Sequence, residues 1–94
     1  KSREISVKTT SIEEFMKKYS LDRIDLLKID CEGSEYKILF KCPKEIIKKI
    51  SKITMEYHPI DKSRNAKTLK KFLEKNGFKV RFTRGDSWML YAKR

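Results

Sequence analysis

The segment Ile24-Asp25-Leu26-Leu27-Lys28-Ile29-Asp30 restricts the fold of this chain more than any other feature. It is short, largely apolar and flanked by polar residues and Gly33, which is typical of a strand that is buried on both faces. Strands of this kind occur in parallel sheets that are covered by helices. We therefore expect an α/β fold in which residues 24–30 form a central strand.

The N-terminal neighbours of this strand have strand and helix patterns. Ile5 and Val7 alternate with polar residues, which predicts a strand at about 4–9. Ser11 and Glu14 have capping-box spacing, and the apolar residues that follow Ser11 predict a helix over roughly 12–19. These elements place a strand and a helix before the central strand.

The rest of the chain continues the alternation. Pro43 fits the first turn of a second helix, whose inner side carries Ile46, Ile47 and Ile50. Three further elements follow: a strand at 52–58, a helix at 64–75 closed by Asn76-Gly77, and a hairpin of 78–82 and 88–92. This order predicts an α/β sheet that is parallel until the last strand turns back.

The length of 94 residues suits one domain, residues 1–94, without a linker or an internal repeat. No apolar run approaches the ~20 residues of a membrane span. The polar start and the absence of an initiator Met indicate no signal peptide and a trimmed or processed piece. Cys31 and Cys42 fit neither a disulfide framework nor a zinc site. We expect buried thiols and a cytoplasmic location.

Polar side chains gather where two of the predicted strands end. Strand 24–30 ends in Asp30 and is followed closely by Glu32, and strand 52–58 ends with Glu56 and His58. Ligands of open α/β sheets bind beyond the carboxyl ends of the strands. A carboxylate and a histidine there can take a proton from an alcohol, or can hold a divalent metal that lowers the pKa of the alcohol. We therefore predict Asp30, Glu32, Glu56 and His58 as catalytic residues.

Structural roles for the same residues remain open at this point. Glu32 and Glu35 fall in the first turn of the helix after Gly33, where the helix macrodipole alone favours acidic side chains. Lys28 can pair with a neighbouring carboxylate such as Glu56. A histidine beside proline, like His58, often makes a structural hydrogen bond.

The positive charge lies almost entirely in the second part of the chain. The formal net charge is +11, residues 1–40 carry 8 basic and 8 acidic side chains, and residues 41–94 carry 16 basic and 5 acidic ones. Such a distribution suits a module that binds an anionic partner such as nucleic acid, with Phe82, Trp88 and Tyr91 available for stacking. Lys67, Lys71 and Lys75 also fit the solvated face of an amphipathic helix. Binding of nucleic acid through the basic part is thus the alternative function.

The string Asp25-Leu26-Leu27-Lys28-Ile29-Asp30-Cys31-Glu32-Gly33-Ser34-Glu35 resembles the D-L-L-K-I-D-V-E-G-A-E signature of the FkbM family of S-adenosylmethionine-dependent methyltransferases. Residues 7–15 are similar to its V-x-x-T-T-L-D-x-L segment, 53–58 to its I-x-x-E-x-H strand, and 69–78 to its L-x-x-x-L-x-x-x-G-F helix exit. The resemblance covers nearly the whole chain.

The resemblance implies the C-terminal half of a Rossmann-like class I methyltransferase, with a mostly parallel sheet that ends in an antiparallel hairpin. Residues 24–30 would be its fourth strand and 52–58 its fifth. Asp30 and Glu32 would line the acceptor pocket beside Glu56 and His58. The implied reaction is transfer of a methyl group from S-adenosylmethionine to a hydroxyl of a sugar or secondary metabolite, with a divalent metal as a possible addition.

The sequence departs from this pattern in its glycines. Gly33, Gly77 and Gly85 are too far apart for the glycine-rich cofactor turn, so the nucleotide-binding half is absent. Phe40-Lys41-Cys42-Pro43 also stands where the family has a K-G-A turn. We expect the chain to need a missing N-terminal segment or self-association, and to be inactive alone. Asp30 with Glu35-Tyr36-Lys37 also matches the motif of metal-dependent nucleases, but lacks room for the paired strands of that site.

Overall fold

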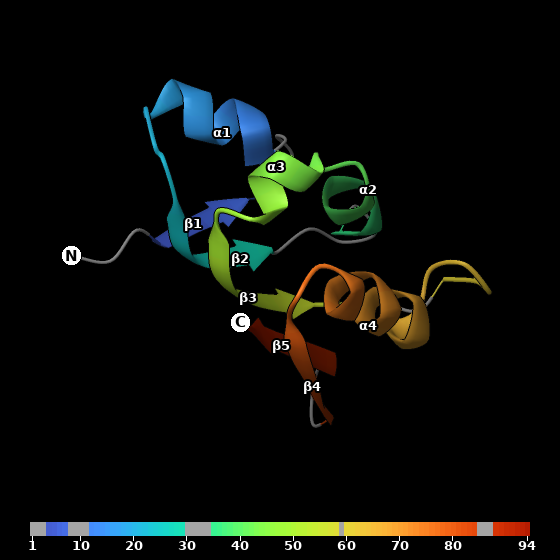
Figure 1. Ribbon diagram of the computed structural model, residues 1–94. Helices are drawn as coiled ribbons and strands as arrows, with labels where there is room; N and C mark the ends of the chain where they lie inside the picture. Colours follow the sequence, from blue (N-terminus) through green and yellow to red (C-terminus); the bar gives the residue numbers. More distant parts are fainter. Residues whose placement is uncertain (1–3, 8–11, 30–34, 59, 85–87) are drawn as a thin grey trace.

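A computed structural model describes residues 4–7, 12–29, 35–58, 60–84 and 88–94. Strands and helices alternate along the chain until the final hairpin (Figure 1). The elements are β1 (Glu4–Val7), α1 (Ile12–Lys18), β2 (Ile24–Ile29), α2 (Glu35–Phe40), α3 (Lys44–Ile47), β3 (Ile50–Glu56), α4 (Ala66–Lys75), β4 (Lys79–Arg84) and β5 (Trp88–Lys93). The predicted α/β class is confirmed. The predicted order holds except between β2 and β3, where two helices, α2 and α3, take the place of the single helix in that order.

The strands form one mixed sheet with the order β1-β2-β3-β5-β4. β1 pairs with β2 and β2 with β3 in parallel, whereas β5 pairs antiparallel with both β3 and β4. The first four strands therefore share one direction and only β5 runs the other way, as predicted. Because β5 inserts between β3 and β4, two of the four strand pairings are antiparallel, and the sheet is not mostly parallel.

Helices cover one face of the sheet, and the alternation of side chains along the strands shows which face it is (Figure 1). Leu27, Ile53 and Leu90 point into the core and are fully buried. The side chains of Lys28 and Lys52 point the other way and are exposed. The core is completed from the helices by a set of apolar residues, namely Ile12, Met16, Tyr36, Leu39, Ile47, Leu69 and Leu73.

Several boundaries differ from their predictions, and β3 is displaced by two residues, from 52–58 to Ile50–Glu56. Ile50 does not belong to the second helix but begins β3, because the Ile24 amide donates to the Lys49 carbonyl at 2.8 Å and extends the parallel ladder to that point. The helix after Pro43 is thus a single turn, α3. Ile50 still reaches the core, with none of its surface exposed.

Helix α4 has a specific start and a specific end. Asn65 accepts from the Thr68 amide, and Thr68 Oγ1 accepts from the Asn65 amide, which forms a capping box. Gly77 follows the helix with φ of 92°, in the left-handed region that favours glycine, as the sequence predicts. The lysines of α4 are exposed, which confirms the solvated helix face. With 10 residues, α4 is the longest helix in the described part of the chain, and none there is long and apolar enough to cross a membrane.

Arg94 ties three segments together at the end of β5. Its guanidinium donates to the carbonyls of Ile50 at 2.8 Å, Ile47 at 2.7 Å and Asn76 at 2.7 Å. The same group lies 4.2 Å from the centre of the Phe78 ring. It therefore satisfies carbonyls at the end of α3, at the start of β3 and after α4.

We predict that Arg94→Ala lowers the free energy of unfolding by about 2 kcal/mol, because three charge-assisted hydrogen bonds are lost. Arg94→Lys should recover only part of this, because an ammonium group lacks the guanidinium fork. Urea unfolding followed by circular dichroism measures the effect, with the exposed Lys70→Ala as control. Equal midpoints for Arg94→Ala and the wild type would contradict this role.

Candidate functional site

The polar residues that follow β2 and β3 lie at one edge of the sheet. Glu56 is the last residue of β3, His58 follows it, and Glu35 is the first residue of α2. β2 and β3 are parallel neighbours, so their carboxyl ends lie at the same edge of the sheet. The predicted residues Asp30 and Glu32 lie outside the described residues, so their assignment stays a prediction.

Glu35 is a buried carboxylate that holds His58. Its side chain has no exposed surface, and its Oε2 accepts from the His58 backbone amide at 2.8 Å. The same oxygen lies 3.0 Å from Nδ1 of the His58 ring. A buried carboxylate is costly unless it receives hydrogen bonds, so these two contacts fix both the backbone and the ring of His58.

The second oxygen of Glu35 has a different environment. Oε1 is buried and has no hydrogen-bond partner among the described residues. A buried acceptor of this kind calls for a donor. The carboxylate therefore has free hydrogen-bonding capacity on the side away from His58.

The ring of His58 is open to solvent on its other side. Nε2 lies 3.5 Å from Oε1 of Glu56, and the side chains of His58 and Glu56 are 42% and 37% exposed. With a proton on Nδ1 shared with Glu35, the neutral ring keeps a lone pair on Nε2. A carboxylate that holds Nδ1 of a partly exposed histidine is the arrangement of an oriented general base.

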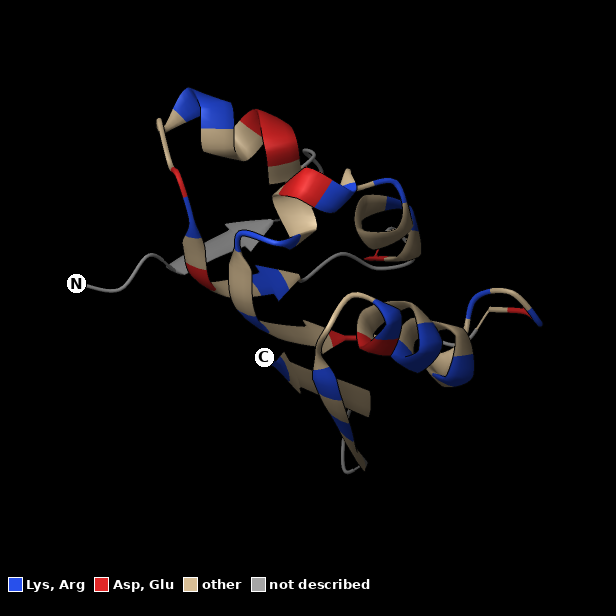
Figure 2. Cartoon of the chain, viewed as in Figure 1, with Lys and Arg blue, Asp and Glu red and all other residues tan. Residues whose placement is uncertain are grey.

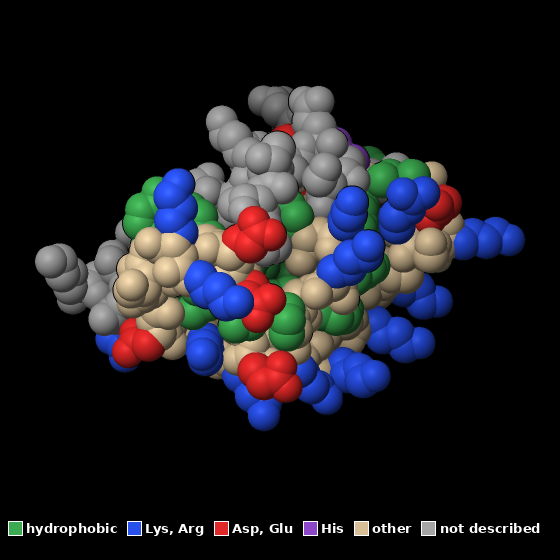
Figure 3. All heavy atoms as spheres, turned by 90° about the horizontal axis from the view of Figure 1, so that it is seen from above, with side chains coloured by type: hydrophobic (Ala, Val, Ile, Leu, Met, Phe, Trp, Pro, Cys, Tyr) green, Lys and Arg blue, Asp and Glu red, His purple; other side chains and the backbone are tan. Residues whose placement is uncertain are grey.

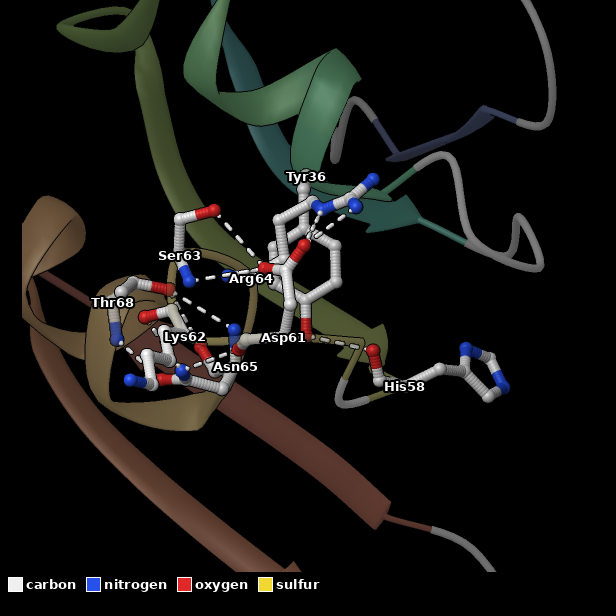
Figure 4. Close-up of polar contacts among 8 residues, drawn as sticks. All are labelled: Tyr36, His58, Asp61, Lys62, Ser63, Arg64, Asn65 and Thr68. Atoms are coloured by element: carbon white, nitrogen blue, oxygen red, sulfur yellow. Dashed lines mark hydrogen bonds and ion pairs between the residues drawn. The ribbon is translucent and has the colours of Figure 1, made fainter.

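Tyr36 and the loop after β3 hold the backbone of this histidine in place. The Tyr36 hydroxyl donates to the His58 carbonyl at 2.9 Å, which Figure 4 draws as a dashed line. Burial, with the nearby charge of Glu35, raises the pKa of Tyr36 to about 12, so the hydroxyl stays a donor at neutral pH. The imidazole ring points away from the Asp61 loop in the same view (Figure 4).

Asp61 organises the loop that leads from His58 to α4. Its carboxylate accepts from the Arg64 guanidinium at 2.6 Å and 3.1 Å and from the backbone amides of Ser63 and Arg64. The hydrogen bonds from Arg64, followed by those from Ser63, hold the pKa of the Asp61 carboxyl well below its usual range. These hydrogen bonds lie within the loop itself. They restrict the backbone that follows His58.

The sequence predictions for this edge have mixed outcomes. Glu56 and His58 are neighbours, as their spacing indicates, although their catalytic role stays a prediction. No ion pair joins Lys28 to Glu56, whose carboxylate faces His58. The sequence pattern around Glu35 indicated a helix macrodipole contact or a nuclease motif, and its contact with His58 was not predicted. The second Glu of the E-G-S-E string was the available signal.

The described residues do not form a metal site. Among them, no three His, Cys, Asp or Glu side chains converge on a point where an ion could bind. Glu35 and Glu56 lie on opposite nitrogens of the His58 ring, which explains why these three do not converge. Lys37 of the nuclease motif is exposed on α2, whereas Glu35 is buried.

A second cofactor question concerns S-adenosylmethionine. The cofactor turn needs clustered glycines, and Gly77, after α4, is the one glycine in the described ranges. The groove on the helix-free face of the sheet is lined by Lys52, Lys79, Arg81 and Lys93, whose positive charges repel the sulfonium centre of this molecule. The described residues therefore do not fit the cofactor.

Cys42 is a free, half-buried thiol after α2. Burial, with a smaller contribution from Glu13, raises its pKa to about 12. The thiolate is the nucleophilic form, so Cys42 is inert at neutral pH. Because the pKa is higher in the folded chain, the stabilisation is complete below the ordinary value of 9.0 and is lost as the pH rises toward 12.

We predict that iodoacetamide alkylates Cys42 at pH 8 at least about tenfold more slowly in the folded chain than in urea. The Cys31→Ser variant makes Cys42 the sole thiol, and mass spectrometry follows the reaction. Equal rates in the two states would contradict the burial of this group.

We predict that neutral His58 carries its proton on Nδ1. The chain has a single histidine, so long-range ¹H–¹⁵N correlation spectra of the ring report on His58 without assignment. Glu35→Gln should shift the population toward the Nε2-protonated form, because the amide oxygen holds the Nδ1 proton less strongly than the carboxylate. An exposed counterpart, Glu74→Gln, should leave the spectrum unchanged. An Nε2-protonated ring in the wild type would contradict the geometry.

Comparisons with known proteins bear on the same residues. A sequence model of the methyltransferase FkbM domain matches residues 1–80. No curated protein matches the chain, and no solved structure matches it either. The matched range includes the three parallel strands, α4 and the Glu35, Glu56 and His58 side chains. The chain therefore belongs to the FkbM methyltransferase family.

Proposed function

We propose that this chain carries the acceptor side of an S-adenosylmethionine-dependent O-methyltransferase and that His58 is its general base. The observation that carries the proposal is the contact between buried Glu35 and Nδ1 of His58, at 3.0 Å, on a histidine side chain that is 42% exposed. Membership in the FkbM family supplies the reaction class. The acceptor would be a hydroxyl of a sugar or a secondary metabolite.

The proposed chemistry at this edge is the removal of a proton. An acceptor hydroxyl within hydrogen-bond distance of Nε2 gives its proton to His58, and its oxygen becomes the nucleophile. Glu35 keeps the ring oriented and stabilises the imidazolium that forms, in the role that a buried carboxylate has beside a catalytic histidine. Glu56 adds a second negative charge near Nε2. When bound, S-adenosylmethionine would supply the methyl group.

The cofactor site of this proposal lies outside the described residues. The order of β3, β5 and β4, with the last strand inserted before the edge, supports a C-terminal half of a Rossmann-like fold. In that fold the glycine-rich turn belongs to the first strand of the other half. We infer that an N-terminal segment completes the cofactor site and that the enzyme acts in the cytoplasm.

Calorimetry tests the division of labour between the two halves. We expect S-adenosylmethionine to give no binding heat with the 94-residue chain. We expect measurable heat with a chain extended at its N-terminus by the residues that the gene encodes before Lys1. Tight binding to the 94 residues alone would contradict the division.

A second test addresses the base in the extended chain. His58→Ala should lower kcat for transfer of a labelled methyl group to a panel of hydroxylated acceptors by about 10²- to 10⁴-fold, the usual contribution of a general base. Added imidazole should restore part of the activity, because it replaces the missing ring. His58→Ala with full activity would exclude the proposal.

Positioning by Glu35 is tested in the same assay. Glu35→Gln should lower kcat with little change in KM, because the base is misoriented while the acceptor still binds. Glu74→Gln, exposed on α4, is the matched control and should be neutral. A rise in KM alone would assign Glu35 to acceptor binding instead.

A further inference from the structure

The face of the sheet that bears no helix carries a concentration of positive charge. Five cationic side chains point from it into solvent, from four different strands: Lys28, Lys52, Lys79, Arg81 and Lys93. Figure 2 shows the blue segments along β4 and at the end of β5. In the view from above (Figure 3), acidic side chains lie among the basic ones on the left and in the centre, and basic side chains prevail on the right. The five cationic side chains of the helix-free face lie together on one surface of the sheet.

The strand register places three of these lysines in one line. Lys52 of β3 is the partner of Lys93 of β5, and Lys93 is the partner of Lys79 of β4. Neighbouring strands lie about 4.8 Å apart, and like charges directly opposite each other destabilise a sheet. Folding alone does not favour such a line, which indicates that these lysines bind an anionic ligand.

A second line of paired residues crosses the same face of the sheet and contains an aromatic ring together with further positive charge. Lys28 is the partner of Thr54, Thr54 of Tyr91, and Tyr91 of Arg81. The Arg81 guanidinium lies 5.0 Å from the centre of the Tyr91 ring. This is a cation–π contact, and it places a guanidinium and an aromatic ring side by side among the lysines.

All residues of these two lines except Lys28 line a groove of about 480 Å³. The residues that line it include no carboxylate: Leu26, Lys52, Thr54, Lys79, Val80, Arg81, Tyr91 and Lys93. Within the described part of the chain, its four cationic side chains make no ion pair. These side chains are therefore available to bind an anionic ligand.

We propose that this groove binds single-stranded nucleic acid, with phosphates at Lys52, Lys79 and Lys93 and a base against the Tyr91 and Arg81 surface. Positively charged grooves with aromatic platforms are the usual means of binding single strands without sequence preference. A flexible strand can place both a base and its phosphates on a groove whose lining residues come from four neighbouring β-strands, β2, β3, β5 and β4. An acidic peptide or a sulfated polysaccharide would use the lysines but would leave the flat Tyr91 surface without a base to stack on it.

The groove is separate from the proposed base. Lys52 lies near the start of β3 and Lys93 at the end of β5, whereas His58 follows the end of β3. The proposal thus does not depend on methyl transfer, and His58→Ala should bind the oligonucleotide as the wild type does. Loss of one activity with retention of the other distinguishes the two proposals.

The test is fluorescence anisotropy of the 94-residue chain with a labelled 20-nucleotide oligothymidine. The groove variant carries Lys52→Gln, Lys79→Gln and Lys93→Gln, and the control carries Lys67→Gln, Lys71→Gln and Lys75→Gln on α4. Each lowers the formal net charge from +11 to +8. In 50 mM salt we expect the groove variant to lose at least about tenfold in affinity and the control less than about twofold. Circular dichroism confirms that both variants are folded.

Two further readouts separate phosphate contacts from stacking. The slope of log affinity against log salt should decrease by about two in the groove variant, because each phosphate contact contributes about 0.7 for a single strand. Tyr91→Leu should weaken binding by about fivefold or more and leave the slope unchanged, because stacking releases no counterions.

Three outcomes would overturn the proposal. Equal losses in the two triple variants would assign binding to net charge rather than to the groove. An absence of binding in 50 mM salt would exclude nucleic acid as the ligand. Displacement of the oligonucleotide by polyglutamate at equal concentration of charge would point to an acidic protein segment instead.

Discussion

The burial of the Glu35 carboxylate is the constraint on which the candidate site depends. A charged group with no exposed surface needs donors, and the backbone amide and the Nδ1 of His58 supply two of them to one oxygen. Because Glu35 begins α2 and His58 follows β3, the same contact joins the segments after two neighbouring parallel strands. The contact therefore packs α2 against the end of β3 and orients the His58 ring, whose Nε2 lies 3.5 Å from the Glu56 carboxylate.

Much of the fold was predictable, because the patterns that specify it are local. A short apolar run identifies β2, the alternation of apolar residues identifies β3 and the hairpin, and the Asn76-Gly77 pair marks the end of α4. The insertion of β5 between β3 and β4 was not predictable, since pairing across the sheet depends on long-range packing rather than on periodicity. For the same reason the start of β3 at Ile50, which depends on its pairing with Ile24, was assigned to a helix.

In the candidate site, too, local spacing was predictable and long-range contacts were not. The two-residue spacing of Glu56 and His58 within and after one strand was enough to place them together. Glu35 was not identified, because an acidic residue in the first turn of a helix has an ordinary explanation and its burial is visible only in three dimensions. The line of Lys52, Lys93 and Lys79 likewise depends on register, so composition indicated a basic region but not this surface.

The central claim is that Glu35 and the His58 ring act as a unit, and a double-mutant cycle tests it most directly. The free energies of unfolding of the wild type, Glu35→Gln, His58→Ala and the double variant give the coupling between the two side chains. A coupling of about 1 kcal/mol or more is the result that the geometry predicts. Additive effects, within about 0.3 kcal/mol, would contradict it, because they would mean that the ring and the carboxylate do not interact in solution.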